Sequence, residues 1–337
     1  METLVLGGYT KGRNKGVSFA TLDTDKKKIT NVRLALEIES PTYVTTVGDF
    51  AFSVVKEGDW AGVALLEKQD DVYRQIAAAL TEGVNPPCYV SFDKKRQLIF
   101  SANYHQGFFD VIAITDDGLD VVQSVQFEGS SVHENQQSSH VHYVQMDRAS
   151  EYLMVCDLGT DKVHVFDVKV NGEVKEVFCY QTKVGFGPRH LVQHPTLPIV
   201  YVLGELSNEI DICRYEKGIL THIETVSLLP EEYTDWSGGA AIRVTSDGQF
   251  VYASNRGHDS IVVYKVNNSG VLEPIQWIKT EGKTPRDFHF NQTEDFIIIG
   301  HQDDDVLSLF SRDTKTGLLT LQDKEAIAPE CVCVTPL

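Results

Sequence analysis

Charged side chains inside apolar, strand-like segments are the residues of this chain best suited to chemistry. Glu205 lies between Val202–Gly204 and Leu206, a setting in which a solvated carboxylate is not expected. Arg189 and Arg256 lie in, or directly after, similar alternating segments. Guanidinium groups bind anions. A carboxylate can hold the guanidinium groups in position or can transfer a proton. Together these residue types indicate a reaction in which negative charge develops on oxygen.

Imidazoles accompany these charges. His140 and His142 form an H-x-H pair, and His190 directly follows Arg189. Imidazole is the usual general base near neutral pH. The H-x-H pair could also bind a metal, but no set of Asp, Glu or His partners is evident beside it, so we expect no metal site there. For His142 and His190 the alternative is a packed, hydrogen-bonded position in the core.

The elements that must position these side chains repeat along the chain. Each unit has four strand-like runs separated by turn residues, as in Tyr89–Phe92, Leu98–Ala102, Phe109–Ile114 and Val121–Phe127. No segment has the pattern of a long helix. The units recur every 44 to 53 residues, counted between the anchors Pro41, Pro87, His140, Pro188, Ala240, Pro285 and Pro329. Seven such units predict an all-β fold, a seven-bladed β-propeller of four-stranded antiparallel blades.

The two ends of the chain are expected to complete one blade. Only one strand-like run, Cys331–Val334, follows the last anchor. The segment before the first anchor offers three, Leu4–Leu6, Val17–Ala20 and Ile29–Leu36. We therefore predict that the N- and C-terminal strands share a blade and close the ring, which leaves only short, protected sheet edges. Residues 1–337 would then form a single propeller domain.

In such a blade, the start of the innermost strand and the end of the second strand lie on one face, around the central channel. The strand starts supply His140, Arg189 and Arg286, and Arg256 directly follows a second-strand end. The second-strand ends supply Asn103, Asp157, Glu205, Asn255 and His301. This ring predicts a basic pocket in an acidic protein. The alternative for Asn103, Asp157 and Asn255 is to satisfy loop backbone at the strand ends.

Two connections on this face are longer than the others. The insertions Ser130–Ser139 and Glu231–Ser237 are expected to form pocket walls, with His133 and Trp236 as candidate lining residues. Arg243 is expected to pair with an acidic neighbour.

Several other residues of reactive types are expected to be structural. His164 lies within a strand-like run, and His194 lies in a turn on the opposite face. The six cysteines are scattered through strand-like segments without a C-x-x-C pair, so we expect neither disulfides nor a thiolate metal site.

The composition restricts the partners of the protein. The chain has 30 Lys and Arg against 48 Asp and Glu, a formal charge of −18, which argues against nucleic acid or an anionic membrane as a partner. No apolar run approaches the ~18 residues of a membrane span, and the first residues lack a signal-like pattern. We expect a cytoplasmic location; whether the protein is a monomer or a dimer is left open.

Five segments of the chain match motifs of a known family: Leu6–Thr10, Ser139–His142, Gly187–Leu191, Val202–Leu206 and Ser246–Gly257. In combination they resemble the lactonase family of seven-bladed propellers, which includes cycloisomerase-type 6-phosphogluconolactonases and fungal carboxymuconate lactonising enzymes. The resemblance covers essentially the whole chain. It implies an active site of one or two histidines, two arginines and a glutamate, which map onto His140 or His142, Arg189, Glu205 and Arg256. Ser139 stands where the family more often has proline, so the resemblance does not decide between the two histidines.

The resemblance favours hydrolysis of a phosphorylated sugar lactone, 6-phosphoglucono-1,5-lactone, in the pentose phosphate pathway and without metal or other cofactor. One of the two histidines, or Glu205, would deprotonate water, while Arg189 and Arg256 would hold the oxyanion and the phosphate. Nearby arginines would lower the pKa of Glu205, which favours histidine as the base. Residues expected to support substrate binding are His190, Asn255, Arg286 and His301.

Three alternatives remain at this point. The same site could open or close a carboxylated lactone as a cycloisomerase. A propeller can also bind partners without being an enzyme, although such a face would be expected to expose aromatic residues. A metal-dependent lactonase would need several carboxylate and amide ligands in the channel, which Asn103, Asp157, Glu205 and Asn255 could supply. Adjacent arginines would repel a divalent cation there.

Overall fold

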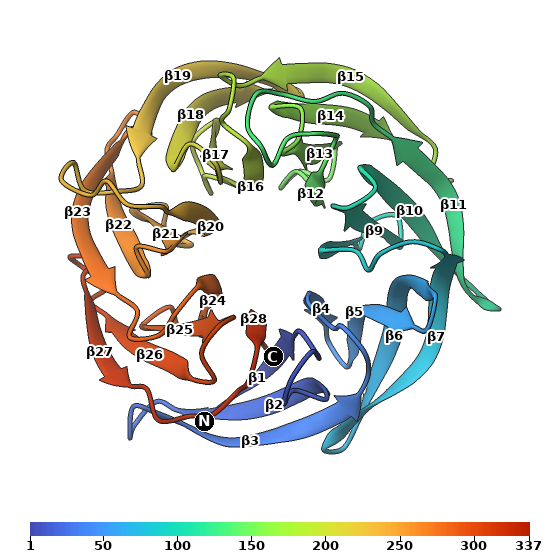
Figure 1. Ribbon diagram of the computed structural model, residues 1–337, viewed down its shortest axis with the longest axis horizontal. Helices are drawn as coiled ribbons and strands as arrows, with labels where there is room; N and C mark the ends of the chain where they lie inside the picture. Colours follow the sequence, from blue (N-terminus) through green and yellow to red (C-terminus); the bar gives the residue numbers. More distant parts are fainter.

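Seven four-stranded antiparallel sheets form a ring in the computed structural model, which describes residues 1–337. Each sheet is one blade of a β-propeller, with its innermost strand beside the central channel and its outermost strand at the rim (Figure 1). The predicted all-β, seven-bladed fold is confirmed. No segment forms a helix that is long and apolar enough to span a membrane.

The strands of each blade follow one another from the channel to the rim. From the innermost to the outermost strand, blade 1 contains β28 (Cys331–Pro336), β1 (Glu2–Gly8), β2 (Gly16–Asp23) and β3 (Lys28–Glu37). Blade 2 contains β4 (Val44–Val47), β5 (Phe50–Glu57), β6 (Trp60–Gln69) and β7 (Val72–Glu82). Blade 3 contains β8 (Tyr89–Asp93), β9 (Leu98–Asn103), β10 (Phe108–Thr115) and β11 (Gly118–Gln126). Blade 4 contains β12 (Val141–Met146), β13 (Tyr152–Asp157), β14 (Lys162–Val168) and β15 (Val174–Gln181).

The remaining three blades have the same order. Blade 5 contains β16 (Pro188–Gln193), β17 (Ile199–Gly204), β18 (Glu209–Glu216) and β19 (Ile219–Ser227). Blade 6 contains β20 (Gly238–Val244), β21 (Phe250–Arg256), β22 (Ser260–Val266) and β23 (Leu272–Lys279). Blade 7 contains β24 (Pro285–Phe290), β25 (Phe296–His301), β26 (Leu307–Arg312) and β27 (Leu319–Asp323).

The core lies between the blades. The second strands β17 and β21 are buried at every position, because a neighbouring blade covers each face of their sheet. The rim strand β19 exposes most of its residues, since only one face meets another blade. The largest cluster of buried apolar side chains, 24 residues, extends from Tyr89 in blade 3 to Leu220 in blade 5. Blade-on-blade packing therefore fixes where each strand end points.

The ring closes through pairing of the two ends of the chain. In blade 1, β1 pairs antiparallel with β28, and Leu6 lies opposite Val334. The Leu337 N–H donates a 2.9 Å hydrogen bond to the Thr3 carbonyl beyond that ladder. The predicted blade shared by both termini is confirmed, and Figure 1 shows the first and last strands side by side.

Five of the seven innermost strands have a β-bulge close to their first residue. In β12, β16 and β24 the extra residue is His142, Arg189 and Arg286, respectively. In β28 it is Val332, and in β20 it falls at Ala240-Ala241. A bulge leaves one residue unpaired and re-aims its side chain. The ladders of β4 and β8 contain no bulge, but the Cys88 N–H just before β8 donates a 2.8 Å hydrogen bond to the carbonyl of Ala102, which lies opposite Tyr89. Cys88 is therefore an extra residue at the start of blade 3.

Candidate active site

A cavity of about 520 Å³ opens at the mouth of the channel where the innermost strands begin. A small adjoining cavity of about 20 Å³ shares part of this lining and reaches the bulged strand starts. The predicted site residues that the two cavities bring together are His142, Arg189, His190, Glu205, Arg256 and Arg286.

Glu205 is the centre of a charge cluster between blades 5 and 6. It directly follows β17, and its Oε2 atom lies 2.9 Å from Arg189 Nε and 2.9 Å from Arg256 Nη2. The Arg189 Nε–H does not point at the carboxylate, so this contact is an ion pair without hydrogen-bond geometry. The Glu205 side chain is 16% exposed. One carboxylate therefore holds two guanidinium groups from neighbouring blades at the cavity wall.

Backbone carbonyls at the bulged start of β20 fix the same two guanidinium groups. Arg189 donates a hydrogen bond to the carbonyl of Ala240. Arg256 donates from Nε to the Gly238 carbonyl at 3.3 Å and from Nη2 to the Gly239 carbonyl at 3.0 Å. A Cβ atom at Gly238 would lie 3.0 Å from Arg256 Nη2, so glycine leaves the space that this guanidinium needs. The sequence of β20 thus positions arginines that belong to other strands.

The charges in the cluster set the pKa values of its members. Burial by itself would raise the pKa of Glu205, but Arg256, Arg189 and Arg286 outweigh burial and lower it below its usual range. Burial, Arg286 and Arg256 lower the pKa of Arg189 to about 9, and Glu205 opposes this change. Both groups remain charged at neutral pH. The lowered pKa of Glu205 agrees with the prediction from sequence.

His142 is the member of the H-x-H pair that lines the cavity. It is the extra residue of the β12 bulge, and its buried Nδ1 atom has no hydrogen-bond partner in the protein. Burial lowers the pKa of His142 well below its usual value, and Arg189, His190 and Arg286 lower it further. His142 is therefore neutral at physiological pH and has a ring nitrogen free to accept a proton.

His140 does not line the cavity. It precedes β12, and its backbone N–H donates to Asp157 at 2.7 Å. Its Nδ1 lies 2.8 Å from the Tyr104 carbonyl oxygen, and its ring stacks on the Tyr104 ring with centroids 4.3 Å apart. The Tyr104 ring in turn lines the cavity and meets His142 edge-on at 5.8 Å. His140 thus supports Tyr104 from the side away from the cavity.

Arg286 provides a third guanidinium group on the blade 7 side of the cavity. Its Nη1 donates a 2.9 Å hydrogen bond to Gln302, and its guanidinium carbon lies 5.9 Å from the centre of the Tyr9 ring. No carboxylate forms an ion pair with it, in contrast to Arg189 and Arg256. Arg286 is therefore the guanidinium group of this cavity that is most available to an anionic ligand.

Aromatic side chains close the channel below the cavity. The Tyr89 ring lies 4.2 Å from Tyr43, 4.8 Å from Tyr143 and 5.4 Å from His190, measured between centroids. Burial and the Arg189 charge lower the pKa of His190 well below its usual value, so this imidazole is neutral. His190 touches the cavity only through the small extension, where it lies 3.3 Å from Arg189 Nη1.

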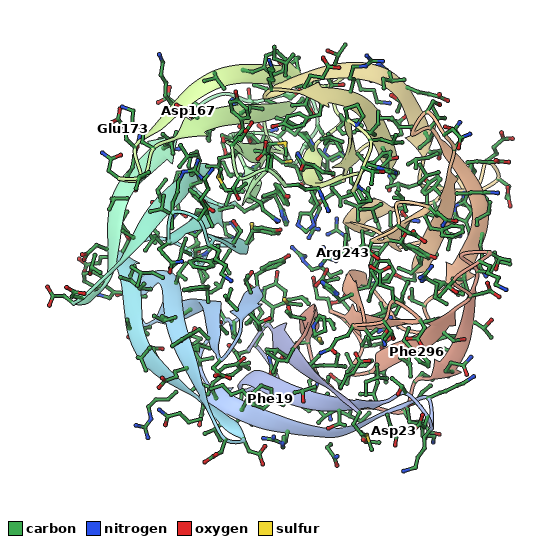
Figure 2. All side chains as sticks on the ribbon, turned by 180° about the vertical axis from the view of Figure 1, so that it is seen from behind. Phe19, Asp23, Asp167, Glu173, Arg243 and Phe296 are labelled. Carbon is green, nitrogen blue, oxygen red and sulfur yellow. The ribbon has the colours of Figure 1, made fainter.

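Arg243 lies on the other side of this aromatic layer, beside the channel (Figure 2). It forms a 3.0 Å ion pair with Asp287, which confirms the predicted acidic partner. A second cavity of about 370 Å³ opens there, at the opposite mouth. Its buried carboxylates are already engaged, Asp93 by Arg96 at 2.6 Å and Asp147 by the Tyr215 hydroxyl at 2.8 Å. We therefore place the candidate active site at the mouth that holds Glu205.

Four residues at the ends of second strands lie outside the two cavities of the candidate active site. Asn255 donates to the Leu228 carbonyl at 3.0 Å, and Asn103 donates to the Asn85 carbonyl at 2.8 Å. Asp157 accepts hydrogen bonds from Ser139, His140, Gly159 and Thr160. The His301 Nδ1 lies 3.0 Å from the Val306 carbonyl oxygen. These side chains satisfy local loops, and the alternative set of metal ligands is not assembled around the cavity.

The cavity is wider than the sequence indicated, because blades 1 to 3 supply much of its wall. Tyr9 and Lys11 follow β1, and Tyr104 and His105 follow β9; none of the four was among the predicted site residues. A signal for the second pair exists, since Tyr104 follows Asn103 as Arg256 follows Asn255.

The two long insertions do not line the cavity. The first is attached to the loop between β13 and β14, because Gln136 donates to the Leu158 carbonyl at 2.8 Å and to Asp161 at 2.7 Å. In the second, Trp236 is 71% exposed and lies outside the lining. The expectation that these insertions are pocket walls is wrong for this cavity; the insertions cover loops of blades 4 and 6 instead.

Known proteins resemble the chain over its whole length. The family model described as "Lactonase, 7-bladed beta-propeller" matches residues 3–336. The 6-phosphogluconolactonase of Bacillus subtilis is 38% identical over 98% of this chain and 96% of its own length. A crystal structure of a Lactobacillus plantarum protein superimposes with a TM-score of 0.97 at 38% identity, over 100% of this chain and 99% of that one. The Pseudomonas aeruginosa periplasmic gluconolactonase PpgL gives 0.92 at 26% identity, over 100% and 99%.

Proposed function

The chain belongs to the lactonase family of seven-bladed β-propellers and is a lactone hydrolase, and we propose that its substrate is 6-phosphoglucono-1,5-lactone. The product would be 6-phosphogluconate. The name of the Bacillus subtilis relative supports this substrate. So does the composition of the cavity, which gathers cations in a protein of net charge −18.

One observation carries the proposal: three guanidinium groups surround a single carboxylate beside a neutral imidazole. Glu205 neutralises only part of the charge of Arg189, Arg256 and Arg286, so the site has a net positive charge. Such a site attracts an anionic substrate and stabilises negative charge that develops during the reaction. The adjacent His142 supplies a group that can accept a proton.

In the proposed reaction, His142 takes a proton from water as the water oxygen bonds to the lactone carbonyl carbon. The carbonyl oxygen becomes an oxyanion, which a guanidinium group stabilises. Arg256 is suited to this role, because its backbone contacts use Nε and Nη2 and leave Nη1 for substrate. When the intermediate collapses, the bond between the carbonyl carbon and the ring oxygen breaks. The ring oxygen then takes the proton back from His142.

Glu205 acts in this scheme as a positioning group. Its Oε2 atom is already occupied by two arginines, whose charges hold the carboxylate in its ionised form. It holds Arg189 and Arg256 in one arrangement before substrate binds, so the reaction does not have to reorganise them.

The phosphate of the substrate is assigned to the blade 1 and blade 7 side of the cavity. Arg286 lies there without a carboxylate partner, and Lys11 and His105 line the same cavity. A guanidinium group can hold two phosphate oxygens at once, which would align the lactone ring over His142. His190 would support Arg189 from below. We assign no substrate contact to Asn255 or His301, because both lie outside the cavity.

The proposed chemistry uses only side chains and water, so the proposal requires neither metal nor cofactor. We also place the enzyme in the cytoplasm, because all six cysteines are free thiols, as is usual in a reducing compartment.

The test compares two lactones. Hydrolysis of freshly made 6-phosphoglucono-1,5-lactone is followed through NADPH from coupled phosphogluconate dehydrogenase, with and without EDTA, and spontaneous hydrolysis is subtracted. Glucono-1,5-lactone is assayed in parallel by acid release. We expect chelator-insensitive activity and a kcat/KM at least about tenfold higher for the phosphorylated substrate, since a hydrogen bond to a charged group is worth about 1.5 to 3 kcal/mol.

Arg286→Ala separates the phosphate contact from the chemistry. This variant should lose the preference for the phosphorylated lactone and keep its kcat/KM on the unphosphorylated one. Equal kcat/KM values for both lactones in the wild type would contradict the proposed substrate and would indicate that the substrate is an unphosphorylated sugar lactone. No hydrolysis of either, together with turnover of a carboxylated lactone, would favour the cycloisomerase alternative.

A further inference from the structure

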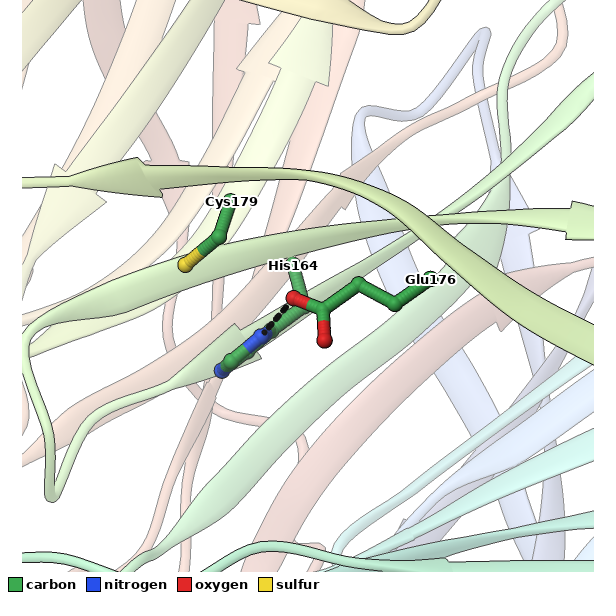
Figure 3. Close-up of side chains that lie close together, drawn as sticks. All are labelled: His164, Glu176 and Cys179. Atoms are coloured by element: carbon green, nitrogen blue, oxygen red, sulfur yellow. Dashed lines mark hydrogen bonds and ion pairs between the residues drawn. The ribbon is translucent and has the colours of Figure 1, made fainter.

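A group of potential metal ligands lies on the outer half of blade 4, away from the channel. His164 in β14 and Glu176 and Cys179 in β15 each direct one ligand atom into the same space, and these three atoms lie within 4.8 Å of one another (Figure 3). Neither the lactonase site nor the core of the fold uses this combination of imidazole, carboxylate and thiol.

The register of the two strands explains how the three side chains meet. His164 lies directly opposite Cys179, so the two share a face of the sheet. Residues 176 and 179 are an odd number apart and would point to opposite faces of a regular strand. A β-bulge between Phe178 and Glu176 shifts the alternation, and Glu176 lies opposite Phe166, on the same face as His164. The bulge therefore completes the group.

The imidazole is held firmly, while its two partners can adjust. The His164 side chain is 8% exposed, and its ring packs on Phe127 with centroids 4.3 Å apart. Its Nδ1 lies 2.8 Å from Glu176 Oε1, and its buried Nε2 has no partner. The side chains of Glu176 and Cys179 are exposed at the surface, so they can close around an ion without disturbing the core.

We propose that His164, Glu176 and Cys179 form a binding site for Zn²⁺ or a similar late transition-metal ion. One nitrogen, one sulfur and one oxygen ligand suit such an ion and do not suit Mg²⁺ or Ca²⁺, which prefer oxygen alone. A tetrahedral Zn²⁺ places its ligand atoms roughly 3.3 to 3.7 Å apart, which small rotations of Glu176 and Cys179 can reach. Water would fill the fourth position.

Metal binding at this place would have two consequences. Burial, together with the Glu176 carboxylate, raises the pKa of the Cys179 thiol, so the free protein holds a neutral thiol and binding releases its proton. The ion would also join β14 to β15, the outermost pair of blade 4, and stabilise the folded protein.

Cobalt provides the direct probe of the site. The full-length protein is treated with EDTA, dialysed and titrated with Co²⁺. We expect a near-ultraviolet thiolate-to-cobalt absorption band that saturates at one Co²⁺ per chain and is bleached by Zn²⁺. Cys179→Ser should abolish the band, and Glu176→Gln should weaken Co²⁺ binding by more than about tenfold. Both residues are exposed, so thermal unfolding of the two metal-free variants should match that of the wild type.

The neighbouring blade offers a control. His222 in β19 lies 3.7 Å from the Asp211 carboxylate and opposite Cys213, but the thiol of Cys213 is fully buried and the three do not form a group of ligand atoms. His222→Ala should leave the cobalt band and the affinity unchanged. Absence of the band in the wild type overturns the proposal, as does a band that persists in Cys179→Ser.

Discussion

The innermost strands of blades 3 and 5 begin at equivalent places on the same face of the disc, yet they contribute in different ways. In blade 3, Cys88 just before β8 is the extra residue, and it offers the cavity only a thiol whose pKa burial raises to about 12. In blade 5, the bulge at Arg189 directs a guanidinium group at Glu205. The repeat supplies the same framework to both, and the type of residue at the extra position decides which blade supplies charge to the site.

The same contrast extends around the ring. The bulged starts of β12 and β24 supply His142 and Arg286, and the bulged start of β20 supplies the carbonyls that hold two arginines. The regular start of β4 is preceded by Thr42, an uncharged residue of the lining. An unpaired residue can turn its side chain toward the channel without costing the sheet a ladder position. The comparison predicts that substitutions of the charged or imidazole residues at the strand starts affect activity far more than substitutions of the uncharged residues there.

The largest effect is expected for Arg189→Ala. It removes a cation from the charge cluster and leaves Glu205 held by Arg256 alone, so kcat/KM should fall by about 100- to 1,000-fold. Steady-state hydrolysis of the phosphorylated lactone measures this. Cys88→Ser is the matched substitution at the corresponding, uncharged position of blade 3, and it should change kcat/KM by less than about threefold. Similar losses in both variants would refute the distinction between charged and uncharged strand starts.

His142→Asn is expected to lower kcat by about 100-fold, because the cavity loses its neutral base but keeps its cations. KM should change little, since Arg286 still binds the phosphate. His140→Asn tests the other member of the pair and should cost less than about tenfold, because that ring only supports Tyr104. A larger loss in His140→Asn than in His142→Asn would reverse the assignment of the base.

The pH dependence tests the same histidine more finely. The base must be unprotonated, and the pKa of His142 lies well below 6.5, so kcat/KM should stay constant from neutral pH down past 6.5 and fall only in more acidic solution. Arg286→Ala removes one of the cations that lower this pKa, so the acidic limb should move to higher pH. The profile is measured with glucono-1,5-lactone, which does not depend on the phosphate contact. An unmoved limb would exclude His142 as the titrating group.

The smallest effect on activity is expected for Asn255→Ala. This side chain is fully buried and supports the Leu228 carbonyl, so its loss should destabilise the protein by about 1 to 3 kcal/mol. The kcat/KM of the folded variant should stay within about threefold of the wild type. Denaturant unfolding and steady-state kinetics measure the two quantities. A large loss of kcat/KM without loss of stability would indicate that Asn255 does contact the substrate.

The strands and their order were accessible from the sequence. In blade 3 all four predicted runs fall on β8 to β11, with ends that differ by three residues or fewer, because alternation and turn residues are local signals. The approximate positions of Arg189, Glu205 and Arg256 were accessible for the same reason. The choice between His140 and His142 was not accessible from the sequence. Alternation places residues two apart on the same face of a strand, and the bulge that separates these two depends on how the strand pairs with its neighbour.

By itself, the sequence determined the seven repeated units, the shared blade and the group of arginines around Glu205, because hydrophobic period and turn chemistry are local properties of the chain. Only the tertiary structure decided which strand starts are bulged, how far blades 1 to 3 surround the cavity, and that Asn255 and His301 serve their own loops. Each of these depends on contacts between segments far apart in the chain, and a bulge is visible only when both strands of a pair are known.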